Sequence, residues 1–295
     1  MTMTVDVLFP YYGDVALMKL AVHSVLKQEY TDFRLVVVDD GYPDDSIPGW
    51  FASLNDPRVS YQRNEKNLGA NGNYRKALSL VENELVIVMG ADDVMMPNYL
   101  QWLVDRAAEF PEAQIFQPGV FVIDQHGAPA HGLVEQIKDR ARPKGHGPRL
   151  LSGEKLAASL LGSNWLYFPS IAWRAEAITK HNFRPEYNVV QDLALALDII
   201  MDGGSLLLDD YACFQYRRHS GSDSSVKALE GTRFAEERAF FTQMAKEMDA
   251  KGWKRAAAVA RAHLSSRLHA GFLLPRAALN KKWSGVKNLA THVVR

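Results

Sequence analysis

The sequence predicts an α/β fold, with a mixed, mostly parallel sheet flanked by helices and followed by a C-terminal helical extension. Two observations carry this expectation. In the first half of the chain, short apolar runs typical of strands buried on both faces alternate with stretches whose apolar residues recur at helical spacing. From Arg233 onward the pattern is helical throughout. Alternating strands and helices favour a parallel sheet joined by right-handed crossovers.

The first half of the chain contains four candidate strands. Val5–Phe9 ends at Pro10, and Arg34–Val38, Arg58–Gln62 and Glu84–Met89 follow it. Helices are predicted between these strands from apolar residues spaced three and four apart. They are expected around Met18 to Leu26, over Asn73–Val81, and from Pro97 through Leu100, Leu103, Val104 and Ala107.

The second half of the chain is less regular. Gln125–Gly153 is rich in Gly, Pro, His and charged residues, which predicts a long loop over the sheet. A strand is expected over Leu166–Trp173, a helix over Gln191–Met201 and a final strand over Leu206–Tyr216. The chain therefore divides into an α/β domain, residues 1–225, and a helical region, residues 226–295.

The composition is that of a globular protein, with 47% hydrophobic and 23% charged residues in a chain of 295. Cys213 is the only cysteine, so neither an internal disulfide nor a cysteine-based zinc site is possible. The amino terminus lacks the pattern of a secretory signal, and no apolar run is long enough to span a membrane. We expect a cytoplasmic protein.

The net charge of zero hides an asymmetry along the chain. Residues Lys251 to Arg295 include ten Lys and Arg and no Asp or Glu, whereas the preceding 250 residues carry 24 basic and 34 acidic residues. The same region has an apolar stripe at helical spacing, which includes Phe234, Phe240, Phe241, Trp253, Ala256, Ala257, Ala260 and Leu264. Packing on the α/β domain, contact with a second subunit, and peripheral attachment to the inner face of a membrane all fit this pattern.

Acidic residues follow two of the buried strands. Asp39-Asp40-Gly41 closes the second strand and Asp92-Asp93 the fourth. Because parallel strands bind ligands at their carboxyl ends, these carboxylates are expected at one edge, where a divalent cation would offset their repulsion. Taken alone, Asp39-Asp40-Gly41 is more often a turn with a helix cap, and Asp92-Asp93 has the same structural explanation.

The motifs in this order resemble glycosyltransferase family 2, the inverting enzymes with a GT-A fold. The resemblance covers about Val5 to Ser225. The matching segments are Pro10-Tyr11-Tyr12, Val38-Asp39-Asp40-Gly41, Asn67-Leu68-Gly69, Gly90-Ala91-Asp92-Asp93, Gln191-Asp192 and Tyr216-Arg217-Arg218-His219.

The resemblance implies roles for these positions. Asp192 would be the catalytic base, and Asp92 and His219 would bind Mn²⁺ or Mg²⁺. Tyr12 would lie against the nucleobase, and Asp40 would accept a hydrogen bond from the base or ribose. The remaining implied contacts are Pro10, Tyr11, Asn67, Gly69 and Asp92 for the nucleotide, Arg75, Arg217, Arg218 and Asp93 for the diphosphate or donor, and Trp165 and Gln191 on the acceptor side.

The implied substrates are a UDP-, GDP- or dTDP-linked sugar and a glycan or glycolipid acceptor of bacterial polysaccharide synthesis, with no nucleic acid. This chain departs from the family pattern in four places. Gly90 stands where many members have Asp, Gln191 replaces the usual Glu, Asn71–Arg75 lacks the commoner Ala-Arg-Asn, and Tyr11 and Gly13 replace small polar residues.

Three other functions remain open from the sequence. A sugar nucleotidyltransferase shares the architecture, but its Gly-rich, Arg-containing first loop is replaced here by Pro10-Tyr11-Tyr12-Gly13. A glycoside hydrolase needs two carboxylates but not the nucleotide and metal motifs. A relative that binds a nucleotide or glycan without turnover is the non-enzymatic alternative, and Gly90 and Gln191 are the residues that favour it.

Overall fold

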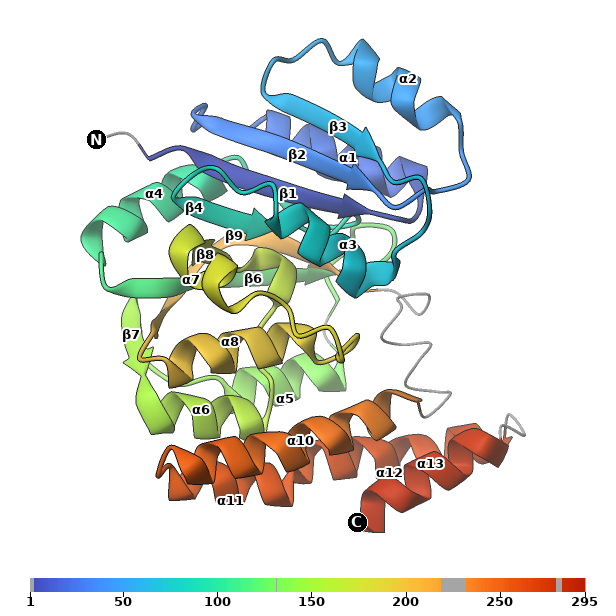
Figure 1. The fold of residues 1–295 in the computed structure, drawn as a ribbon, viewed down its shortest axis with the longest axis vertical. Coiled ribbons are helices and arrows are strands. Elements are labelled where there is room, and N and C mark those ends of the chain that lie inside the picture. The colour runs from blue at the N-terminus through green and yellow to red at the C-terminus, as the bar shows by residue number, and fades with distance from the viewer. Residues whose placement is uncertain (1–2, 131, 219–231, 280–282, 295) are drawn as a thin grey trace.

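The computed structural model describes residues 3–130, 132–218, 232–279 and 283–294. In these residues a nine-stranded sheet is covered by helices on both faces (Figure 1). The strands are β1 (Val5–Tyr11), β2 (Phe33–Asp39), β3 (Val59–Arg63), β4 (Leu85–Val88), β5 (Val94–Met95), β6 (Ala113–Ile123), β7 (Arg149–Ser152), β8 (Ala172–Arg174) and β9 (Ser205–Arg217). The first helices are α1 (Val15–Leu26), α2 (Ser46–Ser53), α3 (Gly69–Leu78), α4 (Tyr99–Glu109), α5 (Leu133–Ala141), α6 (Gly153–Gly162), α7 (Ala175–His181) and α8 (Gln191–Met201). The C-terminal helices are α10 (Thr232–Ala250), α11 (Lys254–Ala262), α12 (Leu264–Leu279) and α13 (Trp283–Val294).

The sheet is mixed and its first half is parallel. Its order is β3-β2-β1-β4-β8-β6-β9-β5, and β7 pairs with β9 outside this path. β3, β2, β1 and β4 are parallel neighbours, whereas β8 runs antiparallel to both β4 and β6. The fold class predicted from the sequence is therefore confirmed, and the carboxyl ends of β1, β2 and β4 lie at one edge.

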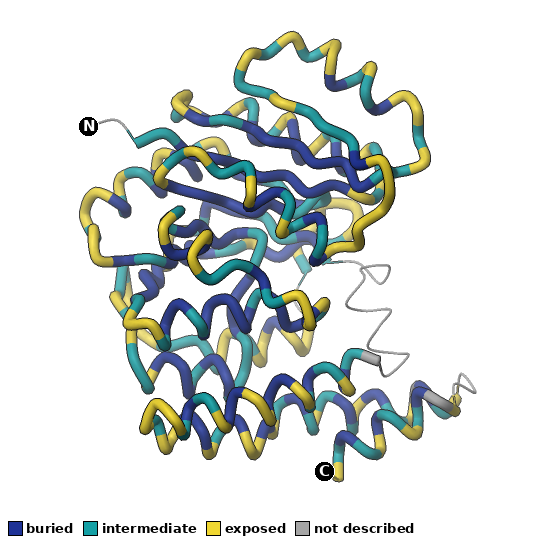
Figure 2. Tube along the Cα trace, viewed as in Figure 1, coloured by how far each residue is buried: buried dark blue, intermediate teal, exposed yellow. Residues whose placement is uncertain are grey.

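The central strands are buried on both faces, which explains their nearly unbroken apolar runs. In β1, Val7 and Phe9 pack with α1, α2 and α4, while Leu8 points to the opposite layer with α6 and α8. Figure 2 shows this burial as dark blue segments through the middle of the molecule. Both layers of the core thus depend on the same strands.

Several predicted elements are found, and two predictions are wrong. β3 and α8 lie where they were expected. The segment Gln125–Gly153 is not a continuous loop, because it contains α5 and β7. The strand predicted over Leu166–Trp173 begins only at Ala172, since a short 3-10 helix (η1, Phe168–Ser170) forms around Pro169. Proline has no N–H to donate to a strand ladder.

Two further differences come from proline and glycine. α4 begins at Tyr99, so Pro97 precedes the helix instead of lying in its first turn. β6 was not predicted, because Pro118 and Gly119 interrupt its apolar pattern. The β6–β9 register shifts at this point, and a Cβ on Gly119 would lie 2.5 Å from the carbonyl oxygen of Asp210. A close backbone approach therefore requires glycine there.

The C-terminal helices share the core of the α/β domain. Phe240, Phe241 and Ala257 belong to the same buried cluster as α6 and α8, which confirms packing on that domain. Leu264 differs, with 62% of its surface exposed. No helix in the described parts of the chain is long and apolar enough to cross a membrane. The predicted boundary between residues 225 and 226 lies outside the described residues.

Candidate active site

The end of β1 presents one aromatic ring and buries the other. Tyr11 is fully buried, and its hydroxyl donates to the carbonyl oxygen of Gly13 at 2.7 Å. Tyr12 is 55% exposed and packs edge-on against Tyr42. Pro10 is also buried within β1. The structure therefore contradicts direct nucleotide contact by the side chains of Pro10 and Tyr11, whereas the Tyr12 ring is accessible at this edge.

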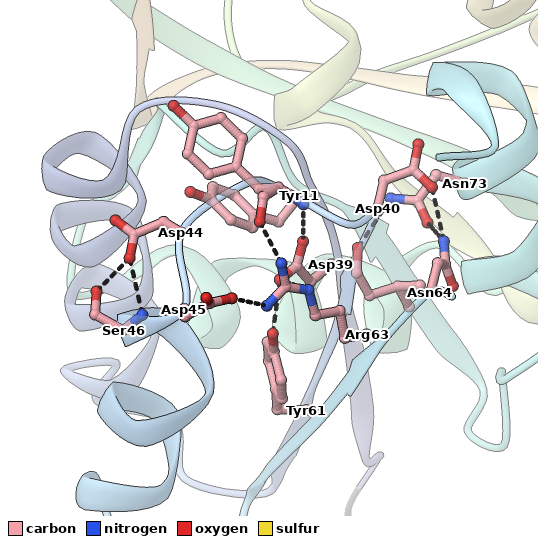
Figure 3. A network of polar contacts seen from close by, with 12 residues as sticks. Tyr11, Asp39, Asp40, Asp44, Asp45, Ser46, Tyr61, Arg63, Asn64 and Asn73 are labelled. Carbon is pink, nitrogen blue, oxygen red and sulfur yellow. Dashed lines mark hydrogen bonds and ion pairs between the residues drawn. The ribbon is translucent and has the colours of Figure 1, made fainter. Parts of the chain in front are cut away.

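The two carboxylates at the end of β2 have different partners, as Figure 3 shows. Asp39 Oδ2 accepts from the Tyr61 hydroxyl at 2.6 Å, and its Oδ1 accepts from the backbone N–H of Tyr42 at 2.9 Å. Asp40 Oδ1 accepts from Asn64 Nδ2 at 2.7 Å and from the N–H of Leu68 at 2.8 Å. Asp40 thus fixes the loop that leads into α3, and its predicted contact with the nucleoside stays a prediction.

The loop before α3 places the predicted Asn67 and Gly69 at the surface. Asn67 Oδ1 accepts from the N–H of Gly69 at 2.9 Å. Gly69 has a positive φ of 75°, a conformation that favours glycine. Arg75 lies in the last turn of α3 and is exposed. The local conformation explains the Asn-x-Gly pattern, while nucleotide or donor contact by these residues stays a prediction.

A buried carboxylate organises the end of β4. Asp93 is 1% exposed, and its Oδ1 accepts from the backbone N–H of Arg217 at 2.7 Å. Burial, followed by the charge of Asp92, raises the pKa of Asp93 well above its usual value. A Cβ on Gly90 would lie 2.3 Å from Asp93 Oδ2. The Asp93 carboxylate therefore fills the space that a side chain at position 90 would need.

This arrangement corrects two predicted donor contacts. Asp93 is enclosed by protein, so it does not reach a diphosphate directly. Arg217 is 6% exposed, and its guanidinium donates to the carbonyl oxygens of Asp92 at 2.7 Å and Asp124 at 3.0 Å. Both side chains hold the ends of β4 and β9 together.

Asp92, unlike its neighbour Asp93, remains partly exposed. Its carboxylate oxygens suit Mg²⁺ or Mn²⁺, and added positive charge beside Asp92 and Asp93 would offset the raised pKa of the buried acid. These carboxylates therefore fit a divalent cation as their ligand partner. No group of three or more His, Cys, Asp or Glu side chains forms a metal site in the parts of the chain that the structure describes. The other predicted ligand, His219, lies outside them.

Asp192 lies in the first turn of α8 and is partly buried. Burial raises its pKa, while the N–H of Leu193 and the positive charges of Lys138 and Arg233 lower it. An aspartate with a raised pKa is suited to accept a proton near neutral pH. The structure thus gives the predicted base an environment consistent with that role.

Lys138 was missed by the sequence analysis because it falls in the segment predicted as a loop. It extends from α5, and its ammonium lies 4.1 Å from the centre of the Tyr167 ring and donates to the carbonyl oxygen of Leu166. Burial and the charge of Arg218 lower its pKa to about 8, against the opposing charge of Asp192. The helical spacing of Leu133, Val134 and Ile137 was the signal that α5 existed.

Tyr216, near the end of β9, is influenced by the charges of both the predicted metal motif and the predicted base. Its ring packs 5.3 Å from that of Tyr167. Burial raises its pKa, and the negative charges of Asp93, Asp92 and Asp192 raise it further. The negative charges of all three carboxylates therefore disfavour ionisation of the Tyr216 phenol.

Arg218 follows Tyr216 and Arg217 at the end of β9. Its Nε forms an ion pair with Glu135 Oε1 of α5 at 2.5 Å, and its N–H donates to the carbonyl oxygen of Ile123 at 2.8 Å. The guanidinium is partly exposed, so its contact with the diphosphate stays a prediction.

The two predicted acceptor residues differ in outcome. The proposed stacking of Trp165 on a sugar is wrong, because the ring is 1% exposed in the core and its Nε1 donates to Ser159 Oγ at 3.0 Å. Gln191 is 7% exposed and adjoins Asp192 in the chain. Its Oε1 has no hydrogen-bond partner among the described residues. A buried acceptor without a donor is suited to a ligand hydroxyl.

Sequence comparisons identify related proteins. The sequence model described as glycosyl transferase family 2 matches residues 6–173. An uncharacterized protein of Mycobacterium tuberculosis is 28% identical over 78% of this chain and 71% of its own length. The succinoglycan biosynthesis protein ExoO of Rhizobium meliloti is 26% identical over 71% of this chain, which spans 59% of that relative. A GalNAc(5)-diNAcBac-PP-undecaprenol beta-1,3-glucosyltransferase of Campylobacter jejuni is 28% identical over 37% of this chain and 34% of its own length.

Solved structures share the fold. Residues 1–349 of S. aureus TarS, solved in complex with UDP-GlcNAc, align with a TM-score of 0.61 at 14% identity over 99% of this chain and 90% of that one. The mannosyltransferase PcManGT from Pyrobaculum calidifontis, in complex with GDP-Man and Mn²⁺, aligns with a TM-score of 0.60 at 16% identity over 98% of this chain and 86% of that one. These similarities establish a GT-A architecture.

Gly90→Ala tests the packing at the end of β4. The new Cβ would displace the Asp93 carboxylate from Gly90 and from the Arg217 N–H, so we expect a loss of about 1–3 kcal/mol in the free energy of unfolding. Urea denaturation measures this loss. Gly13→Ala is the control, because a Cβ there meets nothing within 4 Å. Equal stability of the two variants would contradict the assigned contact.

Proposed function

This chain belongs to glycosyl transferase family 2, and we propose that it transfers a sugar from a nucleotide-diphosphate donor to an acceptor hydroxyl with inversion at the anomeric carbon. We assign the donor to the UDP-, GDP- or dTDP-linked sugars, a choice supported by the UDP-GlcNAc and GDP-Man complexes of its structural neighbours. Relatives named for succinoglycan biosynthesis and for an undecaprenol-linked substrate support a glycan or glycolipid acceptor in bacterial polysaccharide synthesis. We place this reaction in the cytoplasm.

The observation that carries the proposal is the position of two carboxylates in the family motifs, Asp92 and Asp192, both of which remain partly exposed. Asp92 lies at the end of β4, beside the parallel edge where nucleotides bind in open α/β sheets. Asp192 lies in the first turn of α8, and its charge contributes to the raised pKa of Tyr216. We assign the first carboxylate to the donor diphosphate and the second to the acceptor hydroxyl.

Asp192 takes the proton in the proposed reaction. The acceptor oxygen attacks the anomeric carbon as its proton passes to the Asp192 carboxylate. The bond from that carbon to the diphosphate oxygen breaks, and the nucleoside diphosphate leaves with the electron pair. A single displacement of this kind inverts the anomeric configuration and forms no covalent intermediate with the enzyme. We assign to Gln191 Oε1, which is buried and has no hydrogen-bond partner among the described residues, a hydrogen bond accepted from the acceptor.

We propose that Asp92, with His219, holds a divalent cation. Such a cation, when bound, neutralises charge on the donor diphosphate. The exposed Tyr12 ring is placed to cover a nucleobase, and Arg218 and Arg75 supply positive charge toward the phosphates. Arg suits phosphate because its planar guanidinium donates two parallel hydrogen bonds.

Nucleotide titration is the direct test of the donor site. We expect one of UDP, GDP or dTDP to bind in calorimetry with Mn²⁺ and to bind more weakly after EDTA is added. Asp92→Asn should weaken the metal-dependent part, because it removes a charged ligand. Asp105→Asn, on the exposed face of α4, is the control. Unchanged metal-dependent binding in Asp92→Asn would refute its assignment, and no nucleotide binding would favour a glycan-binding relative without turnover.

Asp192→Asn separates chemistry from binding. The amide cannot accept the acceptor proton, so we expect the transfer rate to fall on the order of 10²–10⁴-fold while the nucleotide affinity stays unchanged. A radiolabelled-donor assay against an acceptor panel measures the rate, and calorimetry measures the affinity. Near-normal transfer by this variant would exclude Asp192 as the base.

Lys138→Met tests the electrostatic setting of the base. The Lys138 charge lowers the pKa of Asp192, so its removal should raise that pKa. Because the carboxylate is the active form, activity is lost as the pH falls through this pKa, and the acid limb of the kcat/KM profile should move to higher pH. Lys138→Arg retains the charge and should leave the limb closer to its original position. An acid limb that does not move in Lys138→Met would contradict the coupling.

A further inference from the structure

The outer face of α12 is apolar along its whole length. Leu264, Leu268, Phe272 and Leu279 are 62, 66, 71 and 83% exposed. Their spacing of four, four and seven residues places them on one side of the helix. Trp283, at the start of α13, is 69% exposed. These five residues are called the C-terminal stripe.

The C-terminal stripe is not the face by which α12 joins the protein. Ala270, Leu273 and Ala277 form the inner face and pack with Phe234 and Leu289 of the neighbouring helices. α12 is therefore apolar on two sides, one already covered and one open. Rows of large apolar side chains on a soluble surface mark an interaction site, because exposing them to water is unfavourable.

The positive charge of the C-terminal region favours an anionic partner for the C-terminal stripe. Residues Lys251 to Arg295 carry ten basic residues and no acidic residue. Lys254 and Arg261 of α11 form ion pairs with Asp249, whereas α12 and α13 carry basic residues and no acidic residue of their own. A second copy docked through the same stripe would bring two of these basic helix pairs together. An anionic lipid surface offers both a counter-charge and an apolar layer.

We propose that the C-terminal stripe inserts into the surface of an anionic lipid bilayer and anchors the protein peripherally. Leucine and phenylalanine enter the acyl boundary, tryptophan lies at the headgroup level, and the basic residues contact the lipid phosphates. No helix of the described chain crosses the bilayer in this arrangement. Figure 1 shows α12 and α13 in the layer of helices at the bottom of the molecule, at the other end of its long axis from β2 and β3.

Vesicle sedimentation tests the proposal with the full chain and no substrate, so its outcome is independent of the transfer reaction. We expect binding to phosphatidylcholine vesicles that contain phosphatidylglycerol and much weaker binding to phosphatidylcholine alone. The triple variant Leu268→Gln, Phe272→Gln, Leu279→Gln should lower the partition coefficient about tenfold or more, since it removes the inserted apolar area. Phe272→Gln alone should give an intermediate loss.

The control is Leu20→Gln, which removes a 55% exposed leucine from α1 and should bind like the unaltered protein. Because the substituted residues are exposed, unchanged thermal unfolding should show that the variants remain folded. Absence of binding to anionic vesicles, or equal binding by the triple variant, would overturn the proposal. A dimer in analytical ultracentrifugation that the triple variant dissociates, without vesicle binding, would assign the stripe to a second copy instead.

Discussion

The site depends on the buried carboxylate of Asp93, which ties the end of β4 to the end of β9. It accepts a hydrogen bond from the backbone N–H of Arg217, and the guanidinium of the same arginine donates to the carbonyl oxygens of Asp92 and Asp124. These contacts fix the backbone at Asp92 and the point from which Arg218 departs. They also require Gly90, because the carboxylate lies where a Cβ would be. Gly90, a departure from the family pattern, thus leaves room for a neighbouring acid that serves packing.

The mixed sheet positions the residues on either side of this contact between β4 and β9. The parallel strands β2, β1 and β4 present the edge with Tyr12, Asp40 and Asp92. β8 lies between β4 and β6 and runs antiparallel to both. The chain then continues through α7 to α8, where Asp192 lies. α5, which follows β6, adds Lys138 above the Tyr167 ring and Glu135 against Arg218. Charges from distant parts of the chain thereby determine the environment of the base.

The C-terminal helices pack on the α/β domain with one set of residues, and they leave another set exposed for the proposed membrane contact. α10 and α11 complete the core behind α6 and α8 with Phe240, Phe241 and Ala257, so they support the helix that carries Asp192. α12 packs inward with Ala270, Leu273 and Ala277 and leaves Leu264, Leu268, Phe272 and Leu279 outward. The proposed membrane contact rests on this outward apolar face and on the basic residues of the same region.

The sequence by itself determined the family, the parallel strands, α8 and the order of the polar motifs, because buried runs and short motifs are local patterns. It did not predict β6 or α5, since Pro118 and Gly119 disrupt the first pattern and a Gly- and Pro-rich setting hides the second. The sequence also could not show that Tyr12 is exposed while Tyr11 is buried, or that Trp165 lies in the core and not against a sugar. The local sequence is the same whether an aromatic ring is buried or exposed. Only the tertiary structure decided these cases, since burial and hydrogen-bond partners come from residues far along the chain. Asp93 is the clearest example: its motif resembles a ligand site, but the N–H of Arg217, 124 residues away, makes it part of the core.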